Sequence, residues 1–188
     1  MGMKVVIGGS RGISRLNTQV IGRIENICNR GFHIFVGDAN GIDKAVQQFL
    51  SDINYPEVTV FCMPEGCRNN IGLWPIRRVD SQLRQKSFKY YSRKDREMAK
   101  EADYGFMIWN SRSKGSLSNM IFLLELNKKC LVYFSPKKIF VDLKNSEDLV
   151  RLLSYCTKEA LESFEKTLQL SEKIKALTFR QTILDLTD

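Results

Sequence analysis

The sequence lacks the residues and patterns that several classes of protein require. It has a single histidine, His33, and its five cysteines form no C-x-x-C pair, so we predict no metal site built from Cys and His ligands. It has no run of about 18 apolar residues, the length of a membrane-spanning helix, and no signal-peptide pattern. These absences predict a cytoplasmic protein without a membrane partner.

The cysteines also lack any sign of pairing. Cys28, Cys62 and Cys130 fall in apolar periodic segments, where we expect them to be small core residues. Cys67 is expected to be an inert thiol in a loop. An odd number of cysteines without a signal peptide indicates a reducing setting.

The sequence has little net charge outside one stretch. Of the formal +8, residues 68–100 contribute +7, because they carry ten basic and only three acidic side chains. A localised basic stretch favours one particular anionic partner over diffuse adhesion to polyanions. A solvated basic face without a partner is the alternative.

Short apolar runs alternate with helical patterns along most of the chain. Strands are predicted at residues 4–7, 33–36, 58–63, 104–109 and 131–134. Between them, apolar residues recur at helical spacing from Ile13 to Ile27, over 42–50 and over 117–126. Strands that are apolar on consecutive residues indicate a parallel sheet covered on both faces. The sequence therefore predicts an α/β, Rossmann-like parallel sheet with helices on both faces.

Two further segments complete the predicted organisation. Residues 1–150 form the Rossmann-like domain, and its basic insertion at about 64–92 fits neither the strand nor the helix period. Residues 151–188 form a C-terminal helical extension with Leu161 and Phe164 on an apolar face. This face either packs on its own domain or pairs two subunits in a homodimer.

Three predicted turns after strands have the composition of anion-binding loops. Glycines let a backbone approach a phosphate, and the helix that follows supplies free N–H groups. Asp38 or Asp43 could accept hydrogen bonds from ribose hydroxyls, although Asp43 also suits a first helical turn without any ligand. The candidate ligand- or phosphate-binding residues of these turns are Gly8, Gly9, Ser10, Arg11, Gly37, Asp38, Gly41, Asp43, Gly115, Ser116 and Asn119.

The glycine spacing differs from two common nucleotide-binding motifs. Gly8, Gly9 and Gly12 do not form G-x-G-x-x-G, and no G-x-x-x-x-G-K-[ST] loop is present. We therefore expect neither a nicotinamide dehydrogenase nor a P-loop ATPase, and we predict no cofactor.

The basic stretch interleaves its cations with aromatic rings. Such a pattern suits single-stranded nucleic acid, where cations follow phosphates and rings stack on bases, but it also suits a single nucleotide. Arg68, Asn69 and Lys94 are added to the candidate ligand-binding residues. Trp74 and Tyr91 are the candidates for stacking on a base.

The motifs resemble those of known families. Gly9-Ser10-Arg11, followed by Gly37-x-Ala39-x-Gly41-Ile42-Asp43, resembles the Rossmann domain of DNA-processing protein A (DprA). Glu97-Met98-Ala99-x-x-Ala102-Asp103, with Gly115-Ser116 after the next strand, is similar to the LOG phosphoribohydrolases. Both belong to the SLOG superfamily, and the resemblance covers roughly residues 4–135. It implies a Rossmann-like fold that binds nucleotides, nucleotide-derived ligands or nucleic acid, in a superfamily that often forms dimers.

The LOG pattern is not complete, and this leaves enzymatic activity open. Asn119 stands at the position of the LOG catalytic glutamate and cannot act as a carboxylate base. Lys94 stands where LOG enzymes have an arginine, and Asp95 or Glu97 could substitute as a nearby carboxylate. The first prediction is a nucleotide-derived ligand at the carboxyl edge of the sheet, bound by a sensor or by a hydrolase or transferase. The alternatives are a DprA-like nucleic-acid-binding protein using residues 68–100, or a scaffold that has lost its ligand.

Overall fold

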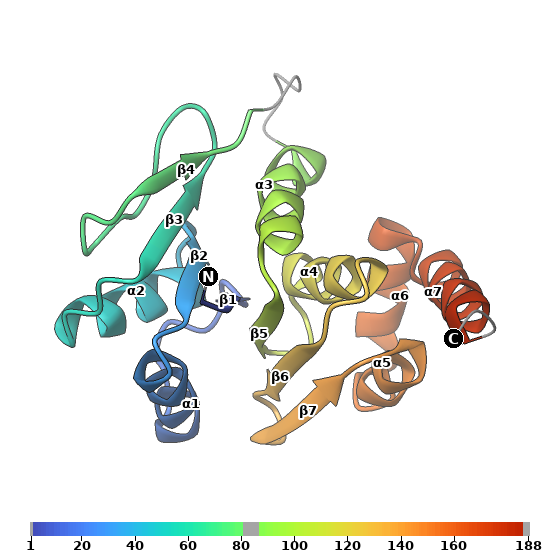
Figure 1. Ribbon diagram of the computed structural model, residues 1–188. Helices are drawn as coiled ribbons and strands as arrows, with labels where there is room; N and C mark the ends of the chain where they lie inside the picture. Colours follow the sequence, from blue (N-terminus) through green and yellow to red (C-terminus); the bar gives the residue numbers. More distant parts are fainter. Residues whose placement is uncertain (1, 81–86, 186–188) are drawn as a thin grey trace.

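A computed structural model describes residues 2–80 and 87–185 of the chain (Figure 1). Within these residues, strands and helices alternate as far as residue 134, except that the strands Val58–Cys62 and Ile76–Arg78 have no helix between them. A final strand and three helices follow. The predicted α/β, Rossmann-like class with a C-terminal helical extension is confirmed. Arg84 and Lys86 of the basic stretch lie outside the described residues.

The described residues form a seven-stranded sheet in the order β4-β3-β2-β1-β5-β6-β7. The strands are β1 Lys4–Gly9, β2 His33–Gly37, β3 Val58–Cys62, β4 Ile76–Arg78, β5 Tyr104–Trp109, β6 Cys130–Phe134 and β7 Ile139–Leu143. Neighbouring strands are parallel, except that β6 and β7 form an antiparallel pair. The five predicted strands are present. Sequence reasoning missed β4, which has three exposed residues, and β7, which lacks a continuous apolar run.

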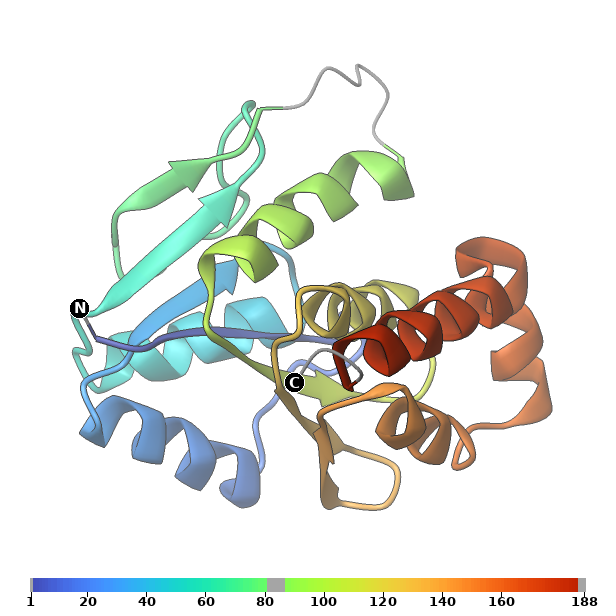
Figure 2. The same cartoon turned by 45° about the vertical axis from the view of Figure 1, so that its right-hand side comes forward.

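Helices cover both faces of the sheet (Figures 1 and 2). The helices are α1 Thr18–Asn29, α2 Ile42–Asp52, α3 Phe88–Glu101, α4 Lys114–Glu125, α5 Ser146–Leu153, α6 Lys158–Leu168 and α7 Leu170–Asp185. Helices α1 and α2 bury Val20, Ile24 and Val46 against one face, while α3 and α4 cover the other. Within the described ranges, no helix has both the length and the apolar character needed to cross a membrane.

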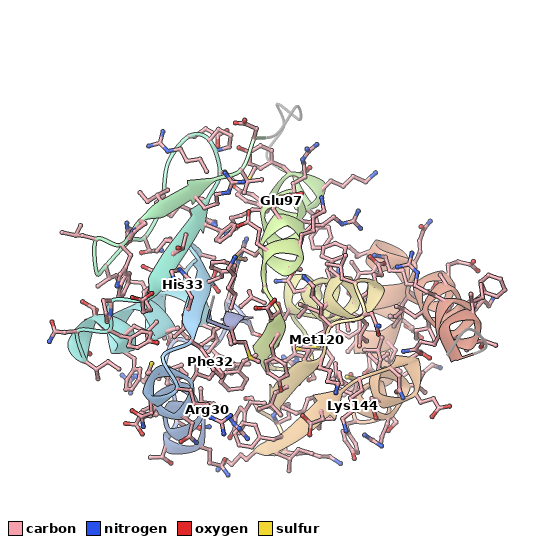
Figure 3. The ribbon with its side chains drawn as sticks, in the orientation of Figure 1. Arg30, Phe32, His33, Glu97, Met120 and Lys144 are labelled. Carbon is pink, nitrogen blue, oxygen red and sulfur yellow. A yellow bond between two sulfur atoms is a disulfide. The ribbon has the colours of Figure 1, made fainter. Side chains whose placement is uncertain are left out.

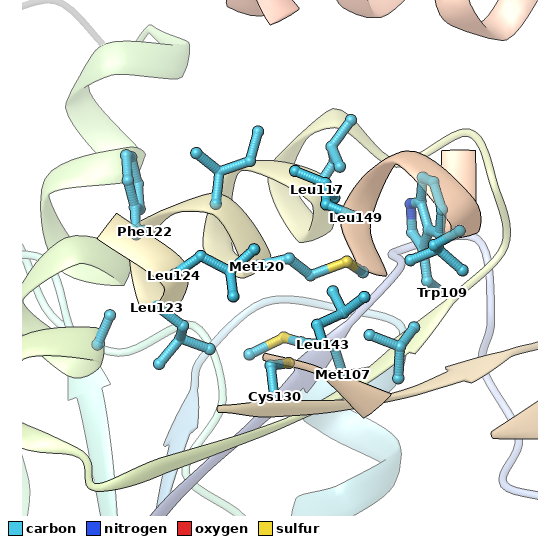
Figure 4. Close-up of a cluster of buried hydrophobic side chains, with 14 of the residues drawn as sticks. Met107, Trp109, Leu117, Met120, Phe122, Leu123, Leu124, Cys130, Leu143 and Leu149 are labelled. Atoms are coloured by element: carbon cyan, nitrogen blue, oxygen red, sulfur yellow. The ribbon is translucent and has the colours of Figure 1, made fainter. Parts of the chain in front are cut away.

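The hydrophobic core is densest between α4 and the sheet (Figure 4). Helix α4 is apolar on most of its surface because it is sandwiched between the sheet on one side and α6 and α7 on the other. Met107 and Trp109 of β5 meet Met120 of α4 in this layer. The position of β5 and α4 is thereby fixed, and both carry residues of the site described below.

Helix α1 begins later than its apolar pattern suggests. Asn17 caps the helix by accepting a hydrogen bond from the Val20 backbone N–H at 3.0 Å. Ile13 and Leu16, which we predicted to be helical, lie in the preceding loop and pack half-buried against the α1–α2 side of the core. The helical spacing of Ile13 and Leu16 therefore reflects the packing of a loop against the core and does not mark a helix.

The C-terminal helices share the core of the sheet. Helix α5 runs across residue 150, where we expected the extension to begin. Phe164 of α6 lies 5.9 Å from the Trp109 ring between ring centroids, and Leu177 of α7 is buried in the same cluster. The extension thus packs on its own chain. The homodimer stays a prediction, with Phe179 as the most exposed aromatic side chain of α7.

One prediction about the cysteines is wrong. Cys62 and Cys67 form a disulfide with their Cα atoms 5.1 Å apart. The turn between them brings this pair together, because Gly66 adopts a φ of +119° and donates a backbone hydrogen bond to Met63. Two of the five cysteines form this disulfide and the other three are free thiols. The odd number of cysteines therefore does not indicate the redox setting.

The strand order places a topological switch point at β1. The chain leaves β1 toward β2 on one side and returns to β5 on the other. Ligands of open α/β sheets bind in the crevice beyond the carboxyl ends of the strands at such a point. The end of β1 is therefore where a site is expected.

A substitution of Gly9, at the end of β1, can test how closely β1 and β5 pack at this switch point. A Cβ atom there would lie 2.2 Å from the Ile108 carbonyl oxygen of β5, so Gly9→Ala must push two central strands apart. We expect it to lower the free energy of unfolding by about 2–3 kcal/mol in urea denaturation. Gly22→Ala on α1, where nothing lies within 4 Å, is the control and should stabilise the protein by up to about 1 kcal/mol. Equal effects of the two changes would contradict this packing.

Candidate ligand-binding pocket

A pocket of about 550 Å³ lies at the switch point, at the carboxyl ends of β1 and β5. The first glycine-rich turn, α3 and the first turns of α4 form its walls. Its volume is in the range of small-molecule and cofactor sites, roughly 300–1,000 Å³. The pocket is thus large enough for a nucleotide.

Ten of the candidate residues from the sequence line this pocket. They come from five separate segments of the chain, which the fold brings together at one edge of the sheet. They are Gly8, Gly9, Arg11, Asp43, Arg68, Tyr91, Lys94, Gly115, Ser116 and Asn119. Asp95, named as a substitute carboxylate, lines it as well, whereas Glu97 pairs with Lys100 outside it.

Some candidates lie elsewhere, and some pocket residues were missed. The candidates that do not line the pocket are Ser10, Gly37, Asp38, Gly41, Asn69 and Trp74. Phe88, Arg112 and Lys114 line it but were not predicted. Arg112 and Lys114 flank the third glycine-containing turn, and their position next to this turn was the signal that could have identified them.

Ser10 holds the first turn against β5. Its side chain is fully buried, and its Oγ donates to Asn110 Oδ1 at 3.0 Å while accepting from the Asn110 backbone N–H at 3.1 Å. The same Asn110 oxygen accepts from the backbone N–H groups of Arg112 and Ser113. Ser10 therefore fixes two walls of the pocket to one another and has its hydrogen bonds satisfied within the protein.

Gly41 packs against the backbone of the first glycine-rich turn. Its φ is +84°, and a Cβ atom there would lie 2.4 Å from the Arg11 Cα. Only glycine fits such a conformation at such a close approach. The second glycine-rich turn thus packs directly beneath the backbone of Arg11 and positions it at the pocket.

A buried ion network lies behind the pocket wall. Asp38 accepts four hydrogen bonds, three from the backbone and guanidinium of Arg68 and one from Lys94 Nζ at 2.8 Å. Burial alone would raise the pKa of Asp38, but the hydrogen bonds from Arg68 and the charge of Lys94 hold this pKa below its ordinary value. Asp38 is therefore ionised and saturated with donors.

Two candidates of the basic insertion have structural partners. Asn69 donates to the Asp38 carbonyl oxygen at 2.8 Å and so ties the insertion to the second turn. Trp74 is 8% exposed, packs over Gly72, and donates from Nε1 to the Tyr55 carbonyl oxygen. Because its ring belongs to the core, Trp74 is not available to stack on a base, and that prediction is wrong.

Two carboxyl groups lie inside the pocket. Asp43 stands in the first turn of α2 and Asp95 on α3, and each is enclosed by protein although part of it faces the pocket. Burial raises the pKa of Asp43 to about 6, against an opposing effect of Lys94. Burial also raises the pKa of Asp95, opposed by Lys94 and Arg11. Both carboxyl groups are poorly hydrated acceptors.

Cationic groups surround the pocket opening. Arg11 and Arg68 both lie against the ring of Tyr91, with guanidinium carbons 5.8 and 5.1 Å from its centroid. Arg112 and Lys114 flank the N-terminus of α4, which Ser113 caps by accepting from the Ser116 N–H. The positive end of the α4 dipole adds to these charges. The opening thus attracts anions.

Much of the remaining basic stretch is neutralised by acidic neighbours. Arg77 pairs with Glu101 at 3.1 Å, and Lys100 with Glu97 at 2.7 Å. Arg96 lies over the Phe122 ring and 3.6 Å from a Glu125 carboxylate oxygen. In the described part of the stretch, Arg68 and Lys94 line the pocket, whereas Arg78, Lys89 and Arg93 are exposed outside it.

Comparisons with known proteins agree with the fold. No family model and no curated protein matches the chain. A solved structure of DNA processing protein A from Helicobacter pylori, described for its single-stranded DNA binding mode, is similar to it with a TM-score of 0.54 and 17% sequence identity. The likeness covers 69% of this chain and 64% of that one. At this identity it supports the Rossmann-like fold alone.

The Asp38 network makes a prediction for stability. Asp38→Asn removes the carboxylate that forms an ion pair at 2.8 Å with the Lys94 ammonium, in a residue only 2% exposed. We expect a loss of about 3–5 kcal/mol in urea denaturation, as for other broken buried pairs. Removing both charges in Asp38→Asn/Lys94→Met should cost less than Asp38→Asn alone. A loss below about 1 kcal/mol for the single variant would contradict the network.

Asp43 makes a prediction for the pH dependence of stability. Its pKa of about 6 in the folded state exceeds the ordinary 3.8, so folding favours the protonated form. The contribution of Asp43 is therefore fully present below about pH 4 and is lost as the pH rises through 6.

Asp43→Asn removes this titration and keeps an acceptor for the Ala39 N–H. We expect the variant to match the wild type near pH 4 and to be more stable by on the order of 1–2 kcal/mol above pH 7. Melting curves across this pH range provide the measurement. A stability difference that does not change with pH would mean that Asp43 titrates normally.

Proposed function

We propose that the pocket binds a nucleotide or a nucleotide-derived ligand through its phosphate. The observation that carries this proposal is the convergence of Arg11, Arg112 and Lys114 with the N-terminus of α4 at a switch-point pocket. Guanidinium groups and free helix N–H groups are complementary to phosphate oxygens. The ligand's phosphate is bound at this end.

The pocket also has aromatic side chains suited to the base of a nucleotide. Tyr91 and the partly exposed Phe88 of α3 line it, on a different element from Arg112 and Lys114. Aromatic faces stack on bases, and the Arg11 and Arg68 guanidinium carbons lie 5.8 and 5.1 Å from the Tyr91 ring centroid. Tyr91 therefore keeps its proposed role in base stacking, while Trp74 does not.

A second candidate function is binding of single-stranded nucleic acid. It is supported by the fold shared with a DNA processing protein A whose single-stranded DNA binding mode has been described. The pocket volume of about 550 Å³ and the pairing of Arg77, Arg96 and Lys100 favour a single nucleotide over a strand. The two functions differ in salt dependence, because a strand releases several counterions on binding.

Arg11→Ala tests the proposed function. Loss of one charge-assisted phosphate contact should weaken binding of adenosine monophosphate at least tenfold in isothermal titration calorimetry. The melting temperature should stay within about 2 °C, because the Arg11 side chain is exposed. Arg30→Ala, on an exposed arginine that ends α1 (Figure 3), is the matched control and should bind as the wild type does.

Two outcomes would decide against the nucleotide proposal. One is the absence of binding for all common nucleoside monophosphates at millimolar concentration. The other is equal affinity in wild type and Arg11→Ala. Tight, steeply salt-dependent binding of a 20-nucleotide oligo(dT) without mononucleotide binding would favour the second candidate.

A further inference from the structure

Asp43 and Asp95 differ from Asp38 in how few donors they have. Asp38 is saturated by Arg68 and Lys94, whereas Asp43 accepts only from the Ala39 N–H, through Oδ2 at 3.2 Å. Among the described residues, no protein group donates a hydrogen bond to Asp95, and neither pocket carboxylate has an ion-pair partner within 4 Å. Buried carboxylates without donors are unfavourable unless a ligand supplies them.

The glycines of the first two turns open Asp43 toward the pocket. A Cβ atom on Gly37 would lie 2.3 Å from Asp43 Oδ2, so this carboxyl group occupies space that only glycine leaves free. Its other oxygen, Oδ1, lies 3.7 Å from the position that a Cβ on Gly8 would take. Gly8 and Asp43 both line the pocket.

A third acceptor lies on the wall formed by α4. The Asn119 Oδ1 atom is buried and has no hydrogen-bond donor within the described part of the chain. Asn119 also lines the pocket. Side chains of three separate elements, α2, α3 and α4, therefore line the same space, and those of α2 and α3 include carboxyl groups with few or no donors.

The described residues contain no group of three or more His, Cys, Asp or Glu side chains that could hold a metal ion. A ligand that satisfies both halves of the pocket carries an anion and, close to it, several hydroxyl or amino donors. A 5′-phosphate attached to a ribose has this arrangement within one small unit. A deoxyribose has one hydroxyl fewer.

We infer that the pocket selects ribonucleotides over deoxyribonucleotides, with the ribose 2′ and 3′ hydroxyls donating to Asp43 and Asp95. The inference rests on the proposed function, since the phosphate is held by the cationic opening. It narrows the ligand class to ribose 5-phosphate derivatives. Because DNA contains deoxyribose, this selectivity also distinguishes the pocket from a DNA-binding site.

Base-free probes provide the most direct test. Ribose 5-phosphate and 2-deoxyribose 5-phosphate, and adenosine and 2′-deoxyadenosine monophosphate, are titrated in parallel by calorimetry at pH 8. We expect the ribose member of each pair to bind at least tenfold more tightly, because a site built around a hydroxyl rejects the analogue that lacks it. Asp43→Asn and Asp95→Asn should each reduce this ratio several-fold.

Matched controls stand on the same helices. Asp52 is the last residue of α2, and Glu97 is on α3 (Figure 3); both lie outside the pocket. The control variants Asp52→Asn and Glu97→Gln should keep the wild-type ratio. Equal binding of ribose and deoxyribose members by the wild type would overturn the inference and leave the proposed function intact. An unchanged ratio in both Asp→Asn variants would also overturn it. Binding of no phosphate compound would overturn the proposed function and the inference together.

Discussion

The buried contact between Asp38 and Lys94 is the constraint on which the site depends. These residues are 56 positions apart and belong to the turn after β2 and to α3. Their ion pair, completed by Arg68, fixes α3 and the basic insertion against the carboxyl edge of the sheet. Since an unpaired charge in this position is strongly unfavourable, α3 has one well-defined position. That position sets the wall carrying Tyr91 and Asp95.

The pocket combines opposite charges at short range. Arg11, Arg112 and Lys114 meet solvent at the opening, while Asp43 and Asp95 lie further in, near Lys94. Cations near the opening attract a phosphate, and enclosed carboxylates favour neutral donors such as hydroxyls. Under the proposed function, a simple anion satisfies only the cationic groups, whereas a phosphate attached to a sugar satisfies the carboxylates as well. This supports a composite ligand over diffuse polyanion binding.

The net charge of residues 68–100, counted along the sequence, does not show what these charged side chains do in the structure. Lys94 is buried in an ion pair, Arg77 and Lys100 are paired with glutamates, and Arg68 supports Asp38. The surplus of positive charge within residues 68–100 therefore serves partly to hold α3 and the insertion in place. Positive charge available to a ligand comes in large part from Arg11, Arg112 and Lys114, outside that stretch.

The sequence by itself determined five of the seven strands, their parallel arrangement and the glycine-rich turns, because apolar periodicity and glycine conformation are local properties. It also identified Arg11, Asp43 and Asn119 as pocket residues, since parallel strands bring their carboxyl ends to one edge. Only the tertiary structure decided that Trp74 is core, that Asp38 is saturated and that Asp95 faces the pocket. These outcomes depend on which partners lie nearby in space, and residues dozens of positions away supply those partners.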